Sequence, residues 1–187
     1  MADPNPITEE ERSNALAELE TSRWRLLTAL QGLTEEQSNL RPAPDRWSIA
    51  ECAEHITASE TSILRLLAVA TAGDRVEAIA ERDDFVRRFI RDRSRRDEAP
   101  ERIRPKRRWS TLAETIRVFE ERRAANLDFA RTTKEDLRSR FYPHPFAGTI
   151  DCYQWLLSLA AHTERHAAQI QEIKEEFVED GGPRTEG

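Results

Sequence analysis

Apolar residues recur at helical spacing in four long stretches of the chain, separated by polar and proline-containing segments. Within each stretch they repeat every three or four residues, which places them on one face of a helix. A residue that can cap a helix precedes each stretch, and a glutamate or glutamine follows it three positions later, as in Thr8 with Glu11 and Ser48 with Glu51. The pattern predicts four helices, at residues 9–31, 49–72, 112–131 and 152–178.

Four amphipathic helices of this length predict an all-α four-helix bundle. The connection between the second and third helices has almost 40 residues, which is enough to cross the bundle, and its part at residues 84–93 has helical spacing of its own. Runs of β-branched and aromatic residues of strand length are absent from the sequence, which argues against an all-β fold. We expect one domain, residues 1–180, and a flexible C-terminal tail, residues 181–187.

The composition, with 38% hydrophobic and 34% charged residues, fits a soluble helical protein with a modest core. No apolar run approaches the ~20 residues of a transmembrane helix, and no basic-then-apolar leader opens the chain. Cys52 and Cys152 make no disulfide framework, so we predict a cytoplasmic protein with reduced thiols. Each cysteine opens a helix, where the helix dipole favours a thiolate, although we favour a buried structural role for both.

The distribution of charge is uneven. A net charge of -6 argues against a general nucleic-acid binder, because phosphate contacts need a basic face. Residues 87–108 nevertheless contain eleven basic and four acidic residues, and we call this segment the arginine-rich insert. It can be a patch for nucleic acid or another anion, or a solvated arm that repels itself unless it meets the acidic remainder of the chain or a second subunit. We favour the arm.

Three of the four histidines lie on the inward faces of predicted helices. His162 and His166 are four residues apart, so their imidazoles lie one above the other, ~6 Å apart, on the last long helix. His55 lies on the inner face of the second long helix, and a modest axial offset brings all three rings together. Three neutral imidazoles with an open position form a catalytic-type site for zinc, nickel, iron or a similar divalent transition metal. The alternative is three packed polar side chains, each satisfied by an ordinary hydrogen bond.

Two other metal motifs do not fit the sequence. A zinc protease of the His-Glu-x-x-His type needs a glutamate directly after the first histidine, but Thr163 follows His162. Glu164 is displaced by a further ~100° around the helix, and we expect it to face solvent. Di-iron bundle proteins need paired Glu-x-x-His motifs, and none occurs in the sequence.

Several other residues near the histidines can support a site. Gln169 and Glu51 each lie one turn from a histidine and can orient an imidazole, although Glu51 fits equally well as a helix-capping residue. His144 lies between two prolines in a predicted loop before the last helix. It can serve as a proton shuttle or substrate contact, which makes it our catalytic candidate, or as a solvated or capping group. We interpret Trp47 and Trp155 as core anchors at helix starts.

Three passages of the chain resemble the DinB-like family of DNA-damage-inducible four-helix metalloproteins. Residues 46–55, RWSIAECAEH, resemble the family's Trp-Ser helix start and its first histidine. Residues 144–155, HPFAGTIDCYQW, resemble its glycine-containing approach to the last helix. Residues 162–170, HTERHAAQI, resemble its His-x-x-x-His element. The passages span most of the chain and are specific as a set.

The resemblance implies a bundle with a crossover topology and a metal held by His55, His162 and His166. The family includes metal-dependent thiol S-transferases and isomerases, hydrolase-like members and many members without a known substrate. Shorter members of the family differ from this chain in the long arginine-rich insert, so the type of substrate cannot be transferred from the family to this chain.

These observations lead to two hypotheses of function. The first is a metal-dependent enzyme acting on a small molecule, either a thiol S-transferase that uses a low-molecular-weight thiol or a hydrolase that activates water. The family resemblance alone gives the transferase a slight preference. The second is a non-enzymatic helical module that binds a metabolite or a protein, or dimerises, with the histidines as packed polar core. Exposed apolar stripes on the predicted helices also lead us to expect a homodimer.

Overall fold

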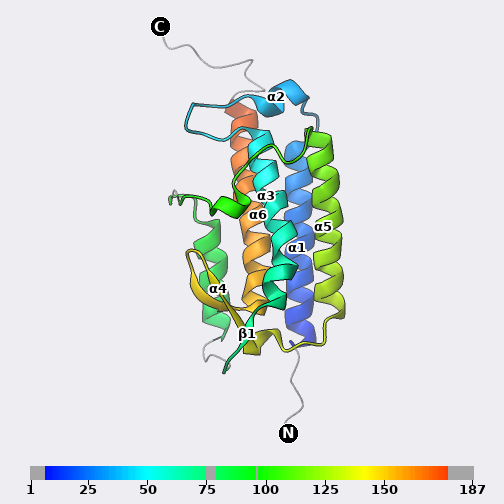
Figure 1. Cartoon of the computed structure of the whole chain (residues 1–187), viewed down its shortest axis with the longest axis vertical. Helices are drawn as coiled ribbons and strands as arrows, with labels where there is room; N and C mark the ends of the chain where they lie inside the picture. Colours follow the sequence, from blue (N-terminus) through cyan, green and yellow to red (C-terminus); the bar gives the residue numbers. More distant parts are fainter. Residues whose placement is uncertain (1–6, 75–78, 96, 177–187) are drawn as a thin grey trace.

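The computed structural model describes residues 7–74, 79–95 and 97–176. Four long helices pack around an apolar core (Figure 1): α1 (Glu9–Leu30), α3 (Ile49–Ala68), α5 (Leu112–Thr132) and α6 (Cys152–Lys174). They confirm the four predicted helices, although α3 ends at Ala68 and not at residue 72. Short helices α2 (Glu35–Asn39), η1 (Glu101–Ile103) and η2 (Leu137–Ser139) lie in the connections.

The predicted caps fix where the long helices begin. The side chain of Ser48 accepts from the amide of Glu51 at the start of α3, and the Glu51 side chain accepts from the amide of Ser48. Asp151 and Gln154 form the same reciprocal pair at the start of α6. Because each cap sets the first helical residue, it also sets the direction in which side chains further along the helix point.

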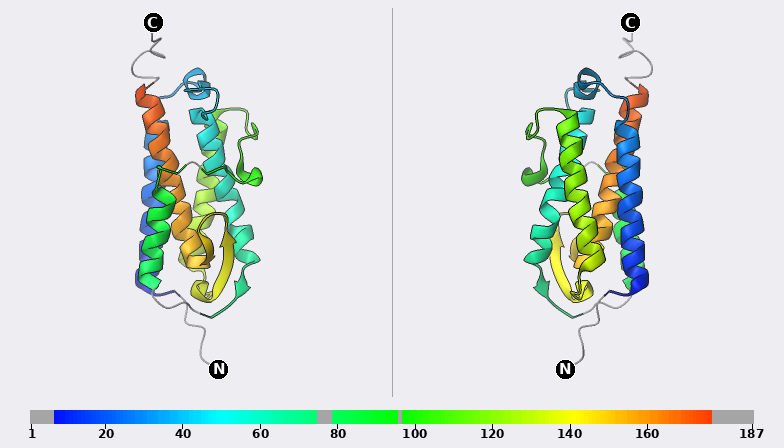
Figure 2. Two further views of the ribbon diagram at one scale, coloured as in Figure 1. Left: turned by 90° about the vertical axis from the view of Figure 1, so that its left-hand side faces the viewer. Right: turned by 90° about the vertical axis from the view of Figure 1, so that its right-hand side faces the viewer.

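The bundle has the expected crossover. Helices α1 and α6 run in one direction, and α3 and α5 run in the other (Figures 1 and 2). Helix α1 packs against α5 and α6, and α3 packs against the same two helices, so α1 and α3 lie on a diagonal. Helix α4 (Ile79–Arg91) carries the chain back along α6, which allows α3 and α5 to lie parallel and side by side.

A small antiparallel sheet closes one end of the bundle, which the all-α prediction did not include. Strands β1 (Thr71–Ala72), β2 (Arg140–His144) and β3 (Gly148–Asp151) lie in the order β1-β2-β3. His144 pairs with Gly148 across the hairpin, and Gly148 has a φ of 73°, which suits glycine. The strands are too short for a period-two pattern to be visible in the sequence.

The arginine-rich insert lies against acidic residues of the long helices, which is one of the two contacts that the arm interpretation left open. Arg87 donates to Glu18 of α1 at 2.8 Å, Arg91 pairs with Glu18 and Glu164, and Arg93 pairs with Glu172. These pairs fix α4 and the following segment to α1 and α6.

None of the described helices combines the length and the apolar character needed to cross a bilayer. The predicted tail, residues 181–187, lies outside the described residues, and the domain boundary at residue 180 stays a prediction.

Candidate metal centre

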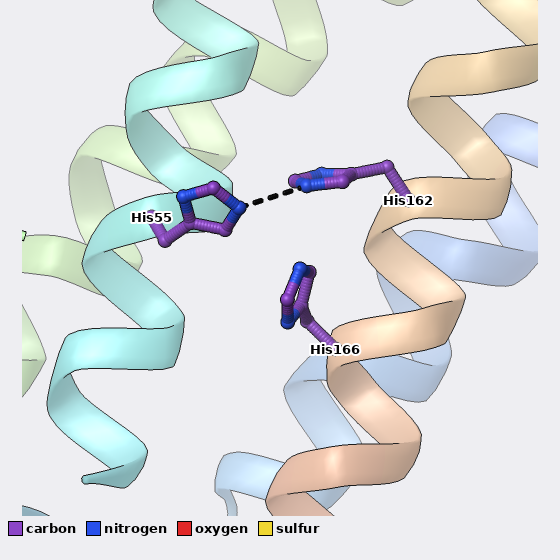
Figure 3. Close-up of side chains that lie close together, drawn as sticks. All are labelled: His55, His162 and His166. Atoms are coloured by element: carbon purple, nitrogen blue, oxygen red, sulfur yellow. Dashed lines mark hydrogen bonds between the residues drawn. The ribbon is translucent and has the colours of Figure 1, made fainter. Parts of the chain in front are cut away.

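The three histidines on the long helices face one another across the contact between α3 and α6 (Figure 3). The Nε2 atoms of His55 and His162 are 2.9 Å apart, and one ring nitrogen from each of the three residues lies within 4.8 Å of the others. The ring centroids are 4.6–4.8 Å apart. His55 and His166 are buried, with 3% and 8% of their surface exposed, and His162 is half-buried.

Hydrogen bonds to two of the rings determine which nitrogen is bare. His55 Nδ1 lies 2.9 Å from the carbonyl oxygen of Ile103, which can only accept, so Nδ1 donates the hydrogen. His166 Nδ1 donates in the same way to Oε1 of Gln169, at 2.9 Å. In a neutral imidazole the other nitrogen then carries only a lone pair. Nε2 of His55 and Nε2 of His166 therefore each have a lone pair that could bind a metal ion.

The surroundings keep the rings neutral at physiological pH. Burial, aided by the nearby charges of Arg108 and Arg165, lowers the pKa of His55 to about 4, although the hydrogen bond to Ile103 opposes the shift. Burial also holds the pKa of His162 and of His166 well below the ordinary value of 6.5. Neutral imidazoles are the form that binds metal, so no proton has to be displaced at neutral pH.

His162 is the ring whose hydrogen bonds are incomplete. Its Nδ1 is buried without a hydrogen-bond partner among the described residues, so hydrogen bonds leave the ring incompletely satisfied. If its Nε2 carries the hydrogen, it donates to Nε2 of His55 at 2.9 Å. If its Nε2 is bare, the two lone pairs face each other at that distance, which is repulsive unless a cation lies between them. Two nitrogens bound ~2.1 Å from one ion lie ~3.0 Å apart at a right angle and ~3.4 Å apart at the tetrahedral angle. The donor set and its spacing therefore fit a divalent transition metal ion.

A pocket of about 160 Å³ opens over the three histidines. Its walls come from α3 and the residues just before it, α4, the part of the insert after α4, the β2–β3 hairpin and α6. They are mainly apolar and aromatic and include Trp47, Ile63, Leu66, Phe89, Trp155 and Leu159. Trp47 packs on the His55 ring, with the centroids 4.8 Å apart. The histidines thus form a polar floor in an apolar pocket, which is the usual composition of a small-molecule site.

His144 lines the same pocket but ends strand β2, whereas the sequence placed it in a loop. Its Nδ1 accepts from the amides of Phe146 at 3.2 Å and Ala147 at 3.1 Å, so its hydrogen is on Nε2, 3.2 Å from Oγ of Ser158. Burial lowers its pKa to about 4. The ring therefore stabilises the hairpin turn, and its action on a substrate stays a prediction.

Of the other residues that the sequence placed near the histidines, one contacts an imidazole and two do not. Gln169 orients His166, as proposed. Glu51 caps α3 and pairs with Arg41, and it makes no bond to an imidazole. The expectation that Glu164 faces solvent was wrong: only 10% of its side chain is exposed, because Arg25 and Arg91 cover it.

The cysteines are not part of the centre. Cys52 and Cys152 are buried, and burial raises the pKa of each thiol to about 12. The thiols therefore stay protonated at physiological pH, in agreement with a structural role and against the thiolate that their helix positions suggested.

Sequence patterns did not reveal how the insert contributes to the site. The carboxylate of Glu54 accepts hydrogen bonds from the amides of Lys106, Arg107 and Arg108, at 2.7–3.2 Å, and from the Arg108 guanidinium at 2.6 Å. These bonds hold the insert over α3, so that the carbonyl of Ile103 reaches His55. A backbone carbonyl has no side-chain signal in a sequence. In the sequence, only the position of Glu54 directly before His55 pointed to this contact.

Comparison with known proteins agrees with this architecture. Among curated proteins, the uncharacterized protein YuaE of Bacillus subtilis (strain 168) is 27% identical over 156 residues, covering 83% of this chain and 94% of YuaE. Among solved structures, TT2238, a four-helix bundle protein, is similar with a TM-score of 0.57 and 23% identity, over 86% of this chain and 98% of TT2238.

YfiT from Bacillus subtilis, described as "a probable metal-dependent hydrolase with an unusual four-helix bundle topology", gives a TM-score of 0.60 at 16% identity. The alignment covers 94% of this chain and 92% of YfiT. Both structures share the fold of this protein. The sequence model of the DinB superfamily matches residues 18–170, most of the chain. The chain therefore belongs to the DinB superfamily, as its three passages predicted.

Proposed function

We propose that this protein is a metal-dependent hydrolase of a small molecule, with His55, His162 and His166 as the ligands of one divalent transition metal ion. The observation that carries the proposal is the convergence of three neutral imidazoles on the floor of an apolar pocket. Within the described part of the chain, no fourth histidine, cysteine or carboxylate joins the group. Structural zinc sites use four protein ligands, whereas catalytic sites use three and leave a position for water or substrate.

Each part of the site has a task in such an enzyme. When bound, the ion supplies Lewis acidity that polarises a substrate oxygen and lowers the pKa of a water ligand. Ile103 and Gln169 hold two of the ligand rings in the tautomer that presents Nε2. The apolar walls exclude bulk water and bury the non-polar part of the substrate.

The size of the pocket favours hydrolysis over a two-substrate reaction. An engineered cavity of about 150 Å³ holds one benzene-sized molecule, and the pocket over the histidines is about 160 Å³. The description of YfiT as a probable metal-dependent hydrolase supports the same choice. A thiol S-transferase is the second candidate, because a further groove of about 420 Å³ shares Ser62, Leu66 and Arg102 with the pocket and offers room for a second substrate.

Metal analysis tests the first part of the proposal. Protein purified without a polyhistidine tag is expected to contain about one transition metal ion per chain, and His162→Ala is expected to lose it. His144→Ala is the matched control, because it removes a histidine of the same pocket that is not a proposed ligand. Full metal content in His162→Ala would refute the assignment. The non-enzymatic module would be favoured if the wild-type protein contains no metal and its melting temperature changes neither with chelator nor with added metal.

Activity assays separate the two reactions. We expect the metal-loaded protein to hydrolyse members of a panel of small esters and amides, and chelation to abolish this activity. Conjugation of a low-molecular-weight thiol to an electrophile, without any hydrolysis, would instead identify the transferase. In cobalt-loaded protein a thiol that binds the ion is expected to give a thiolate-to-metal absorption band, so binding of the thiol can be measured directly.

A further inference from the structure

A basic groove adjoins the pocket over the three histidines. Its lining includes Arg65 and Val69 of α3, Arg102, Arg108 and Trp109 of the insert region, and Tyr142 of β2. Because Ser62, Leu66 and Arg102 line both hollows, the groove and the pocket are neighbours with a shared wall. A molecule in the pocket can therefore extend into the groove.

The charge of the groove is positive and mostly uncompensated. Three arginines line it, and no acidic residue does. Arg108 pairs with Glu54 at 2.6 Å. The guanidinium groups of Arg65 and Arg102 are exposed and make no ion pair or hydrogen bond with the described residues, unlike most cations of the insert, which pair with acids.

The pocket itself contains no comparable unpaired cation except the shared Arg102. Arg165 donates to the carbonyl oxygens of Asp92 and Arg95, so its guanidinium is already engaged. The acids of the pocket are Asp92, which accepts from Ser94, and Asp97, which pairs with Arg95. Among the side chains, unpaired cations are therefore more numerous in the groove than in the pocket. If the reacting end of a substrate occupies the open position of the proposed ion, an anionic group at its other end is better placed in the groove.

We propose that the basic groove binds the anionic end, a carboxylate or a phosphate, of the substrate whose reacting end lies at the three histidines. The substrate class is then a small molecule with an apolar body and one anionic end, and this assignment rests on the proposed function of the site. Arg65 and Arg102 supply planar donors that match two oxygens of either anion. Trp109 and Tyr142 provide aromatic surface beside them. The insert thereby acquires a role as one wall of the substrate site.

The proposal can be tested with three probes that share one apolar body and differ only in the end group: 4-phenylbutyrate, 4-phenylbutyl phosphate and 4-phenylbutanol. Dissociation constants are measured by calorimetry, with the metal-loaded and the chelated protein. We expect at least one anionic probe to bind about tenfold more tightly than the alcohol, as a charge-assisted hydrogen bond predicts. Comparison of the carboxylate with the phosphate identifies the preferred anion.

Variants locate the effect. Arg65→Gln and Arg102→Gln change exposed side chains and are expected to remove most of the anion's advantage while leaving the affinity for the alcohol within about twofold. Arg88→Gln is the matched control, because Arg88 is an exposed insert arginine that lines neither hollow. Retention of the advantage in the Arg65→Gln/Arg102→Gln double variant, or equal affinity for all three probes, would overturn the proposal.

The binding experiment separates a failure of the groove proposal from a failure of the proposed metal site. Anion-dependent binding that survives in the chelated protein supports the groove even if the protein contains no metal. A metal-loaded enzyme without anion preference would instead retain the proposed function and exclude this substrate class.

Discussion

Gln169 fixes His166 through a single hydrogen bond, so it allows the effect of ring orientation to be measured without removal of a ligand. In Gln169→Leu the Nδ1 hydrogen of a buried imidazole loses its acceptor, and the ring is free to turn. Loss of such a partner weakens metal binding by about 10- to 100-fold. Competition with a coloured chelator measures the change. Gln171→Leu is the control, because Gln171 bonds to Glu175 on the surface. Equal metal affinity in both variants would contradict an orienting role for Gln169.

His144 makes folding stability depend on pH. Burial lowers its pKa in the folded protein to about 4, whereas the unfolded value is 6.5. The unfolded chain therefore binds a proton at higher pH than the folded chain. The stabilisation is complete above pH 6.5 and is lost as the pH falls from 6.5 towards 4.

His144→Asn removes this titration, while the Asn side-chain oxygen can replace Nδ1 as acceptor for the amides of Phe146 and Ala147. Between pH 7 and pH 5 the wild type is expected to lose about 1–2 kcal/mol more free energy of unfolding than the variant. Urea denaturation of chelated protein at the two pH values measures the free energy of unfolding. Subtracting the change in the variant from the change in the wild type removes the contribution of the other histidines. Parallel losses in the two proteins would exclude His144 as the source.

At the scale of elements, the position of the insert over α3 depends on Glu54. This carboxylate holds three consecutive backbone amides and one guanidinium, and so positions η1 above His55. We expect Glu54→Ala to lower the free energy of unfolding by about 2 kcal/mol, because bonds to a charged acceptor are lost. Hydrogen exchange at residues 97–110 should accelerate, and metal affinity should fall because the Ile103 carbonyl leaves His55.

Glu98→Ala provides the comparison for this prediction. Glu98 also pairs with an insert arginine, Arg104, but its side chain is 91% exposed, so the pair contributes little. If Glu98→Ala releases the insert as strongly as Glu54→Ala, general charge and not the Glu54 carboxylate holds the segment.

The elements also show which parts of the fold and of the candidate site could be predicted from the sequence alone. Helix starts were predictable because Ser48 and Asp151 make local caps that short sequence motifs encode. The histidine set followed from helical spacing and the family resemblance. Strand β1 was missed because the pairing of Thr71 with Phe141 joins residues far apart in the chain, and no local pattern specifies it. Strands β2 and β3 form a local hairpin, but they are too short for a period-two pattern to be visible. The Ile103 contact was missed for the same reason as β1: it depends on where the insert folds back.

At the scale of the whole molecule, a buried polar cluster joins all four long helices. Arg123 of α5 and Glu60 of α3 form an ion pair in which both side chains are fully buried. Arg123 also donates to Ser22 of α1 at 2.8 Å and to Thr163 of α6 at 2.9 Å, and Asn126 donates to Glu60 at 2.7 Å. Thr163 directly follows His162, so the cluster and the proposed metal ligands share the same stretch of α6.

The cluster predicts a non-additive pattern of stability. Arg123→Met or Glu60→Met alone leaves an unpaired charge in the core, and we expect each to lower the free energy of unfolding by about 3–5 kcal/mol. The double variant leaves no unpaired charge, so it should be much less unstable than the sum of the two single changes. Denaturant titration of the four proteins in this cycle measures the coupling.

The exposed pair of Arg117 and Glu121 on α5 gives the reference for this cycle, because its side chains are 60% and 56% exposed. Alanine at either position should cost less than about 1 kcal/mol, since solvent screens the pair. If the two methionine changes are instead additive, the ion pair is not the source of the cost. The remaining bonds of Arg123 to α1 and α6, which any substitution of that side chain breaks, would then hold the bundle together.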